Sequence, residues 1–192
     1  MLICGEALGI KSEKKLRQER LAKLLEKSPM ATDMELASLL GVSVSTVRLD
    51  RAVMGVPESR ERIKNMAQEA GRKLRSLSRS DIVGDLLELE PNRWALSALR
   101  TTREMSFRTT DYLWDNYIYA QASSIAVAVI EAESVIIDSM RGDYKGHAKV
   151  GDTLIARAKV GINKGNRYIV SVRTRVGDRE IFVGRFIAAV LE

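Results

Sequence analysis

Residues 32–54, TDMELASLLGVSVSTVRLDRAVM, carry the signals for two short helices separated by a sharp turn. Thr32 lies three residues before Glu35, which is the spacing of a capping box, so we predict a helix that begins directly after Thr32. Gly41 is expected to end this helix because glycine adopts the left-handed conformation of a sharp turn at little cost. Ala37 is small enough to let the second helix cross closely.

The second helix is predicted to run from Val44 to about Met54, with Val47 turned inward. In a helix that reads the DNA major groove, the first residues reach base edges while nearby arginine and hydroxyl groups hold phosphates. We therefore predict a helix-turn-helix whose candidate DNA-binding residues are Ser43, Ser45, Thr46, Arg48 and Arg51. The alternative is an αα-hairpin inside a helical bundle.

A basic helix is predicted before this pair, over residues 12–27, and Pro29 is expected to stop it. It completes a three-helix DNA-binding domain over residues 12–55, similar to the heads of DeoR-type regulators. Asp50 departs from the pattern, because such recognition helices often carry an apolar side chain there. We expect Asp50 to orient Arg48 or Arg51, or to cap a neighbouring helix.

The excess of positive charge lies entirely in the first part of the chain. Residues 1–80 contain 16 Lys and Arg against 10 Asp and Glu, and the remainder contains 15 against 15. This asymmetry favours a head that binds a polyanion and a neutral body with another role. The alternative is a basic surface kept for solubility.

Cysteine and histidine are too scarce for several kinds of site. The chain has a single cysteine, Cys4, and a single histidine, His147, so a disulfide framework, a Cys/His zinc site and a Ser-His-Asp triad are not expected. The opening residues 1–10 have no basic start and are too short to span a bilayer. We expect neither an export signal nor a membrane anchor, and a cytoplasmic protein.

An amphipathic linking helix is predicted over residues 56–78. Pro57 is suited to its first turn, and apolar residues recur at steps of three and four from Ile63 to Leu77. The apolar side could pair with a second copy, dock on the following domain, or cover the core of its own domain.

Residues 81–192 change to short runs typical of strands. Residues 84–102 resemble two strands joined by a Pro-Asn turn, and four further strand-like runs follow residue 134. Between them, residues 120–130 are apolar on nearly every side, so a helix there must be buried all round. One buried helix within about six mostly antiparallel strands predicts an α+β domain of the hot-dog fold.

Both halves resemble the FapR family of repressors of bacterial fatty acid and phospholipid synthesis. The resemblance lies in TDMELA, GVSVSTVRLDR and VPESRERIKNMA in the head, and in AQASSIAVAVI, VGDTLIARAKV and VGRF in the body. It implies a homodimer on a palindromic operator of double-stranded DNA, released when malonyl-CoA binds the hot-dog domain. It implies no cofactor and no enzymatic activity.

The resemblance also implies an effector site, which this sequence alters. In the family, an Arg-Gly pair at the start of the central helix meets the malonyl carboxylate, after a Phe and before an Asn. Aligned on AQASSIAVAVI, the pair becomes Trp114 and Asp115, Phe107 matches, and Ser123 replaces the Asn. An indole beside an acid removes the cation that a carboxylate needs, so Arg108 or Arg103 would have to supply it.

Several functions stay open at this point. The effector could be another acyl-CoA, or the domain could have lost its ligand and kept only dimerisation. Hot-dog domains also serve as acyl-CoA thioesterases, in which a carboxylate such as Asp115 would orient water. A DeoR-type sugar-phosphate regulator is a further alternative, although the body is short and rich in strands for one.

Overall fold

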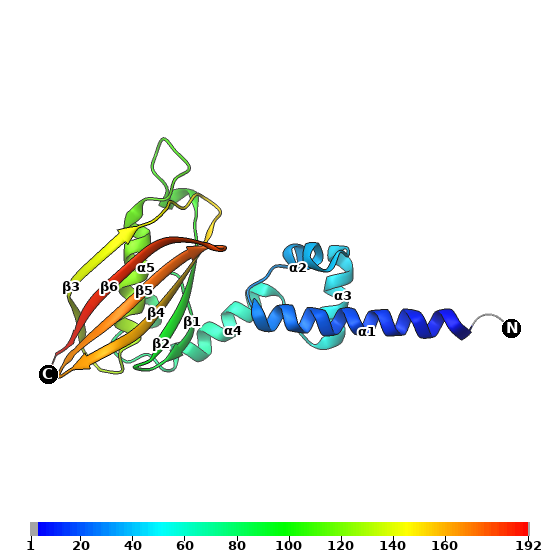
Figure 1. Cartoon of the computed structure of the whole chain (residues 1–192), viewed down its shortest axis with the longest axis horizontal. Coiled ribbons are helices and arrows are strands. Elements are labelled where there is room, and N and C mark those ends of the chain that lie inside the picture. The colour runs from blue at the N-terminus through cyan, green and yellow to red at the C-terminus, as the bar shows by residue number, and fades with distance from the viewer. Residues whose placement is uncertain (1–3, 192) are drawn as a thin grey trace. The chain divides into compact units, whose positions relative to one another are not determined.

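The computed structural model describes residues 4–191 of the chain, with side chains from Glu13 onward (Figure 1). Residues 1–3, which belong to the segment expected to be neither an export signal nor an anchor, lie outside the described residues. The chain divides into two compact units between Asn65 and Met66. We call residues 4–65 the head and residues 66–191 the body.

The head contains the predicted helix-turn-helix. Helices α2 (Asp33–Leu40) and α3 (Val44–Met54) follow α1 (Cys4–Lys27). Thr32 and Glu35 form the predicted capping box, and Gly41 ends α2 in the left-handed conformation with φ 67°. Both helix starts and the turn between them are therefore confirmed. Helix α1 begins at Cys4, earlier than the predicted Ser12.

A small apolar core holds the three helices together. Leu21 of α1, Leu36 and Ala37 of α2, and Val47 of α3 are buried in it. Each helix contributes only one or two buried apolar side chains to this core. Polar or charged side chains therefore occupy some of the other buried positions. Two of these positions, on α3, hold charged side chains that are described below.

The linking helix is shorter than predicted. Helix α4 spans Ser59–Gly71, whereas the sequence predicted one helix over residues 56–78. Residues 72–78 form turns and bends instead, after Gly71 and with Ser76 and Ser78 among them, residue types that favour such conformations over the helix interior. Leu74 and Leu77 of this segment pack against the core of the body.

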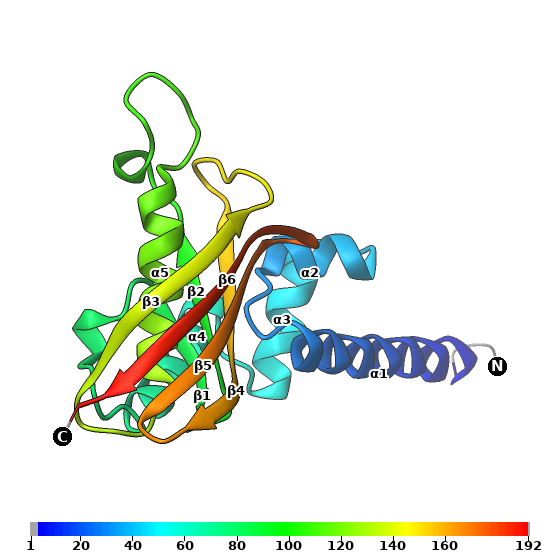
Figure 2. The ribbon, with the colours of Figure 1, turned by 60° about the vertical axis from the view of Figure 1, so that its left-hand side comes forward.

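The body is a six-stranded antiparallel sheet curved round one helix (Figure 2). Its strands are β1 (Asp85–Glu90), β2 (Trp94–Arg100), β3 (Val135–Tyr144), β4 (Thr153–Lys164), β5 (Arg167–Val176) and β6 (Arg179–Val190). Their order in the sheet is β1-β2-β4-β5-β6-β3, so β1 and β3 are the edge strands. Short 3-10 helices η1 (Arg79–Asp81) and η2 (Arg103–Met105) precede β1 and the central helix. All six predicted strands are present, and the hot-dog fold is confirmed.

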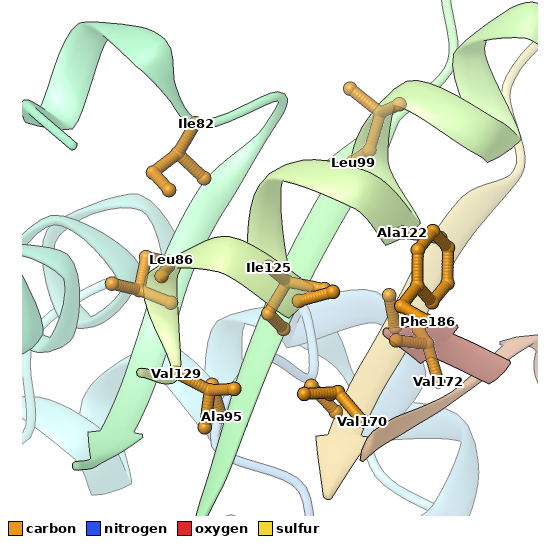
Figure 3. Close-up of a cluster of buried hydrophobic side chains, with 14 of the residues drawn as sticks. Ile82, Leu86, Ala95, Leu99, Ala122, Ile125, Val129, Val170, Val172 and Phe186 are labelled. Carbon is orange, nitrogen blue, oxygen red and sulfur yellow. The ribbon is translucent and has the colours of Figure 1, made fainter. Parts of the chain in front are cut away.

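Helix α5 (Asp115–Ala128) is the centre of the body. It contacts β2, β3, β4, β5 and β6, which explains why its sequence is apolar on nearly every side. Figure 3 shows side chains from the helix and from both halves of the sheet that meet in this core, namely Ile82, Leu86, Ala95, Leu99, Ala122, Ile125, Val129, Val170, Val172 and Phe186.

A pair of glycines makes room for an aromatic ring in this core. Gly142 of β3 lies opposite Gly184 of β6 in the sheet. A Cβ atom at either position would lie 2.8 Å from the ring of Phe182, closer than side chains pack. The ring of Phe182 is fully buried and lies 5.2 Å from that of Tyr144, centre to centre. The two glycines therefore let an aromatic side chain cover the join between β3 and β6.

Among residues 4–191, no helix is both long enough and apolar enough to cross a membrane.

Candidate nucleic-acid interface and effector site

The N-terminus of α3 presents a cluster of hydroxyl groups. The Ser43 Oγ accepts a hydrogen bond from the Thr46 backbone N–H at 3.2 Å and lies 2.8 Å from the hydroxyl oxygens of both Ser45 and Thr46. Ser43 and Ser45 are exposed and Thr46 is half-buried. The cluster thus combines a helix cap with hydroxyl groups that reach solvent.

Arg48 extends into solvent from the same helix. Its side chain is 67% exposed, and its Nε lies 3.4 Å from a carboxylate oxygen of Asp33. An exposed pair of this kind contributes little stability, so the guanidinium is free to exchange partners. Leu49 beside it is also exposed, at 68%, and the sequence prediction did not include this residue among the candidates.

Arg51, the last of the predicted DNA-binding residues, does not extend into solvent. Its side chain is only 6% exposed, and its Nε and Nη2 donate to the Asp33 carboxylate at 2.6 and 2.8 Å. Its Nη1 donates to the Val56 carbonyl at 3.0 Å. With these donors used inside the head, Arg51 joins α3 to α2 and is not available to a phosphate.

Asp50 is also buried, and it pairs with neither Arg48 nor Arg51. Its carboxylate accepts hydrogen bonds from Arg17 Nε at 2.6 Å and from Gln18 Nε2 at 3.0 Å, both on α1. The expectation that Asp50 orients an arginine of its own helix is therefore wrong. Asp50 instead joins α3 to α1.

A third arginine holds the loops of the head. The guanidinium of Arg62, on α4, donates to the carbonyls of Pro29, Ala31 and Pro57 at 2.8, 2.7 and 2.5 Å. Burial lowers the pKa of Arg62 from its usual value, and the three carbonyls solvate the charge. Sequence analysis did not predict this role, because a basic residue in a charged run is typically exposed.

These ion pairs predict how the head responds to acid. Hydrogen bonding from Arg51 lowers the pKa of Asp33, and hydrogen bonding from Arg17 lowers the pKa of Asp50. A carboxylate with a lowered folded-state pKa adds stability that is complete above its unfolded pKa, about 3.9, and is lost as the pH falls through the folded pKa. We expect the melting temperature of the head to stay level from pH 7 to about 5 and to fall below about pH 4.

Circular dichroism at 222 nm checks this expectation, because both tryptophans of the chain lie in the body and indole fluorescence follows the body separately. Asp33→Asn should lower the melting temperature at pH 7, because it leaves Arg51 without its carboxylate, and should flatten the decline in acid. Glu26→Gln, at an exposed carboxylate of α1, serves as the matched control and should leave the decline unchanged. An equal decline in the Asp33→Asn variant would show that this ion pair is not its cause.

The candidate effector residues lie in the loop before α5 and in its first turn. Phe107 and Arg108 are exposed, and the loop closes through a backbone hydrogen bond from Phe107 N to Tyr112 O at 3.1 Å. Arg103 donates to the carbonyls of Thr110 and Arg108 and to the Asp111 carboxylate. Arg103 therefore holds the loop together, which leaves Arg108 as the cation of this loop that is free of ion pairs among the described residues.

Trp114 and Asp115 mark the start of α5. Trp114 is the N-cap residue, is 51% exposed and meets the ring of Tyr117 edge to face at 6.2 Å. Trp114 therefore does not fill the core within one chain. Ser123 lies eight residues after Asp115 along the helix, about 12 Å from it at the rise of an α-helix, and is half-buried. The structure brings Phe107, Arg108, Trp114 and Asp115 to one end of the body and leaves Ser123 apart from them.

No group of three or more His, Cys, Asp or Glu side chains able to hold a metal ion occurs in the part of the chain that the structure describes.

A helix-turn-helix head followed by a body of the hot-dog fold is the architecture of a DNA-binding regulator with a second domain. A transcription factor FapR from Caldanaerobacter subterraneus subsp. tengcongensis is 40% identical over 185 residues, which covers 96% of this chain and 92% of that protein. The chain belongs to the FapR family of transcription factors. No family profile matches it.

Solved structures confirm the fold of the body. A sigma28-regulated virulence protein from Campylobacter jejuni has a TM-score of 0.61 at 23% identity, covering 67% of this chain and 92% of that one. A Streptococcus mutans protein solved bound to acetyl CoA has a TM-score of 0.52 at 15% identity, covering 56% of this chain and 87% of that one. At these identities the likeness concerns the fold alone.

Proposed function

We propose that the protein is a homodimeric repressor of fatty acid and phospholipid biosynthesis genes in the cytoplasm. The head binds a palindromic operator, and malonyl-CoA or a related acyl-CoA in the hot-dog body releases it. The observation that carries this proposal is the 40% identity to a transcription factor FapR, which extends through head and body alike.

The residues proposed to contact DNA are Ser43, Ser45, Thr46 and Arg48. They occupy the first turns of α3, where the hydroxyl groups and the exposed guanidinium match base edges and phosphates. We add Leu49, whose exposed side chain would meet a thymine methyl group in the major groove. Arg51 is left out because its donors bind Asp33 and Val56.

The edge strand β3 supports the homodimer. It is ten residues long and pairs only with β6, so its other edge carries unpaired backbone donors and acceptors. Ile136, Met140 and Tyr144 of this strand are exposed apolar side chains in the single chain. A second copy placed by a twofold axis would cover both the backbone and these side chains.

The first turn of α5 supports an acyl-CoA effector. A helix N-terminus attracts anionic or partly negative groups, and the aromatic side chains of Phe107 and Trp114 beside it are exposed. Arg108 is the cation proposed to meet a malonyl carboxylate. Since Trp114 stands where the family resemblance places a guanidinium, we expect a weaker preference for malonyl over uncharged acyl groups than a paired arginine would give.

DNA binding by the full-length protein tests the regulator. We expect a palindromic operator to be bound at least 10-fold more tightly than one half-site or a scrambled duplex, with affinity that falls steeply as salt rises. Fluorescence anisotropy measures the affinity and sedimentation shows whether two copies are bound. Equal affinity for palindrome and scrambled duplex would contradict the proposal.

A panel of malonyl-CoA, acetyl-CoA and longer acyl-CoAs tests the effector. A ligand that binds only the native state raises the melting temperature of the protein. A ligand that releases the operator must, by linkage, bind the free protein more tightly than the operator complex. Arg108→Gln should reduce the response to malonyl-CoA and spare that to acetyl-CoA. If no acyl-CoA shifts melting or releases the operator, the body is a dimerisation domain alone.

A further inference from the structure

A groove of about 890 Å³ runs over the outer face of the sheet, opposite the face that covers α5. Its floor is apolar and includes Leu96, Ile155 and Val160. Five cations line it, from the β1–β2 turn and from β4 and β5: Arg93, Arg157, Lys159, Arg173 and Arg175. No acidic side chain lines the groove, although residues 81–192 as a whole carry no net charge.

The strand register sets two of these cations directly against each other. Arg157 of β4 is the partner of Arg173 of β5, so their Cβ atoms lie about 5 Å apart. Like charges opposite one another weaken a sheet. Glu180 compensates Arg173, through an ion pair of 3.0 Å. Among the described residues, no ion pair compensates Arg157, Lys159 or Arg175.

Arg157 is held in place despite having no acidic partner. Its guanidinium lies over the indole ring of Trp94, 5.2 Å from the ring centre, so its position is fixed by the aromatic face. A planar guanidinium fixed in this way donates two parallel hydrogen bonds to a phosphate. Arg157 and Arg173 occupy paired positions on neighbouring strands, and Lys159 and Arg175 line the same groove, so several donors are offered to a ligand with more than one phosphate.

We propose that this groove binds a nucleoside diphosphate or triphosphate, with its phosphates between Arg157 and Arg173 and its base on the apolar floor of Leu96 and Ile155. The groove has the size of an ordinary small-molecule site. The apolar floor and the cations line the same groove, and bound phosphates would offset the repulsion between the two arginines. The site shares no residue with the loop before α5, so it goes beyond the proposed acyl-CoA response.

Indole fluorescence tests the site in the full-length protein. The chain has two tryptophans, and Trp114→Phe leaves Trp94 in the groove as the reporter. With excitation at 295 nm, ADP and GDP should each change this signal in a saturable way. Arg157→Gln should weaken binding at least 10-fold. Lys159→Gln should weaken it less, and Lys164→Gln, on the same strand outside the groove, should leave it unchanged.

Competition separates this site from other anion sites. In the parent protein, with ADP binding followed by calorimetry, saturating malonyl-pantetheine, which lacks the adenosine phosphates of coenzyme A, should leave ADP binding intact. Displacement of ADP would place it in the acyl-CoA site and overturn the proposal. If pyrophosphate binds as tightly as ADP, the groove is a general anion site. If nonspecific duplex DNA displaces ADP, the groove is a nucleic-acid contact. Either result overturns the proposal. Absence of a saturable change at millimolar ADP would do the same.

A stability measurement guards against a misfolded variant. At low salt and without ligand, Arg157→Gln should melt at a higher temperature than the parent because the repulsion with Arg173 is removed. If it instead folds poorly, Arg173→Gln replaces it, since Arg173 is the second arginine proposed to hold the phosphates. Unchanged ADP affinity in the folded variant would overturn the proposal.

Discussion

Arg51→Ala is expected to unfold most of the helix-turn-helix, whereas Arg48→Ala, one turn earlier, should leave it folded. Removal of Arg51 leaves the Asp33 carboxylate, itself only 16% exposed, without its two closest donors. Breaking a buried ion pair from one side costs about 3 to 5 kcal/mol. A three-helix head of this size has a stability of similar magnitude, so the helical signal at 222 nm should be largely lost at 37 °C.

Arg48→Ala is the matched control for the same experiment. Because Arg48 is exposed and its pair with Asp33 is weak, we expect a change in stability within about 0.5 kcal/mol. Its operator affinity should nevertheless fall about 10-fold and depend less steeply on salt. An Arg51→Ala head that stays fully folded and loses only DNA binding would restore the role that the sequence pattern suggested for Arg51.

Phe182→Ala is expected to destabilise the body by about 3 to 5 kcal/mol, the usual cost of removing a buried aromatic side chain. The ring is fully buried and fills the space above Gly142 and Gly184, neither of which has a side chain to close the gap. Tyr144 would lose the ring it packs against. Urea unfolding followed by indole fluorescence measures the loss, because both tryptophans belong to the body.

Phe107→Ala is the comparison for this prediction. Phe107 is 46% exposed in the loop before α5, so its removal should cost less than about 1 kcal/mol. The Phe182→Ala variant should also bind the operator poorly if the homodimer depends on the position of β3. If Phe182→Ala loses as little stability as Phe107→Ala, the sheet must close over the space that the missing ring leaves.

Much of the fold could be predicted from local signals. Thr32, Glu35, Gly41 and Ser43 are cap and turn residues whose chemistry acts within a few residues, so the helix starts followed from the sequence. The strands of the body were equally plain, because each one is bounded by turn residues. The length of α4 could not be predicted in this way, because the periodic apolar residues continue beyond the helix into a segment of turns that packs on the core of the body.

The burial of Arg51 has a physical cause that the sequence analysis did not use. Asp50 and Arg51 follow Val47 at steps of three and four, which is the spacing of the buried side of a helix. Charged side chains are seldom buried unless they are paired, and the partners, Arg17 and Asp33, lie on other helices. The spacing therefore contained the signal, but the pairing needed the tertiary structure.

The effector loop shows a different limit. A network centred on Arg103 closes the loop and decides which cation is free, and no periodic pattern encodes such a loop. The separation of Ser123 from Trp114 and Asp115 within one chain also depends on the length of α5.

The rotational setting of α3 about its own axis is fixed by matching opposite charges as well as by the apolar core around Val47. Asp50 forms an ion pair with the guanidinium of Arg17 on α1, and Arg51 forms one with the carboxylate of Asp33 on α2. Turning the helix by one residue would separate both pairs together, whereas an all-apolar contact would tolerate such a slip. The solvent-facing side of α3 can thus change from one relative to another, and with it the DNA sequence preferred, while the angle of presentation is preserved.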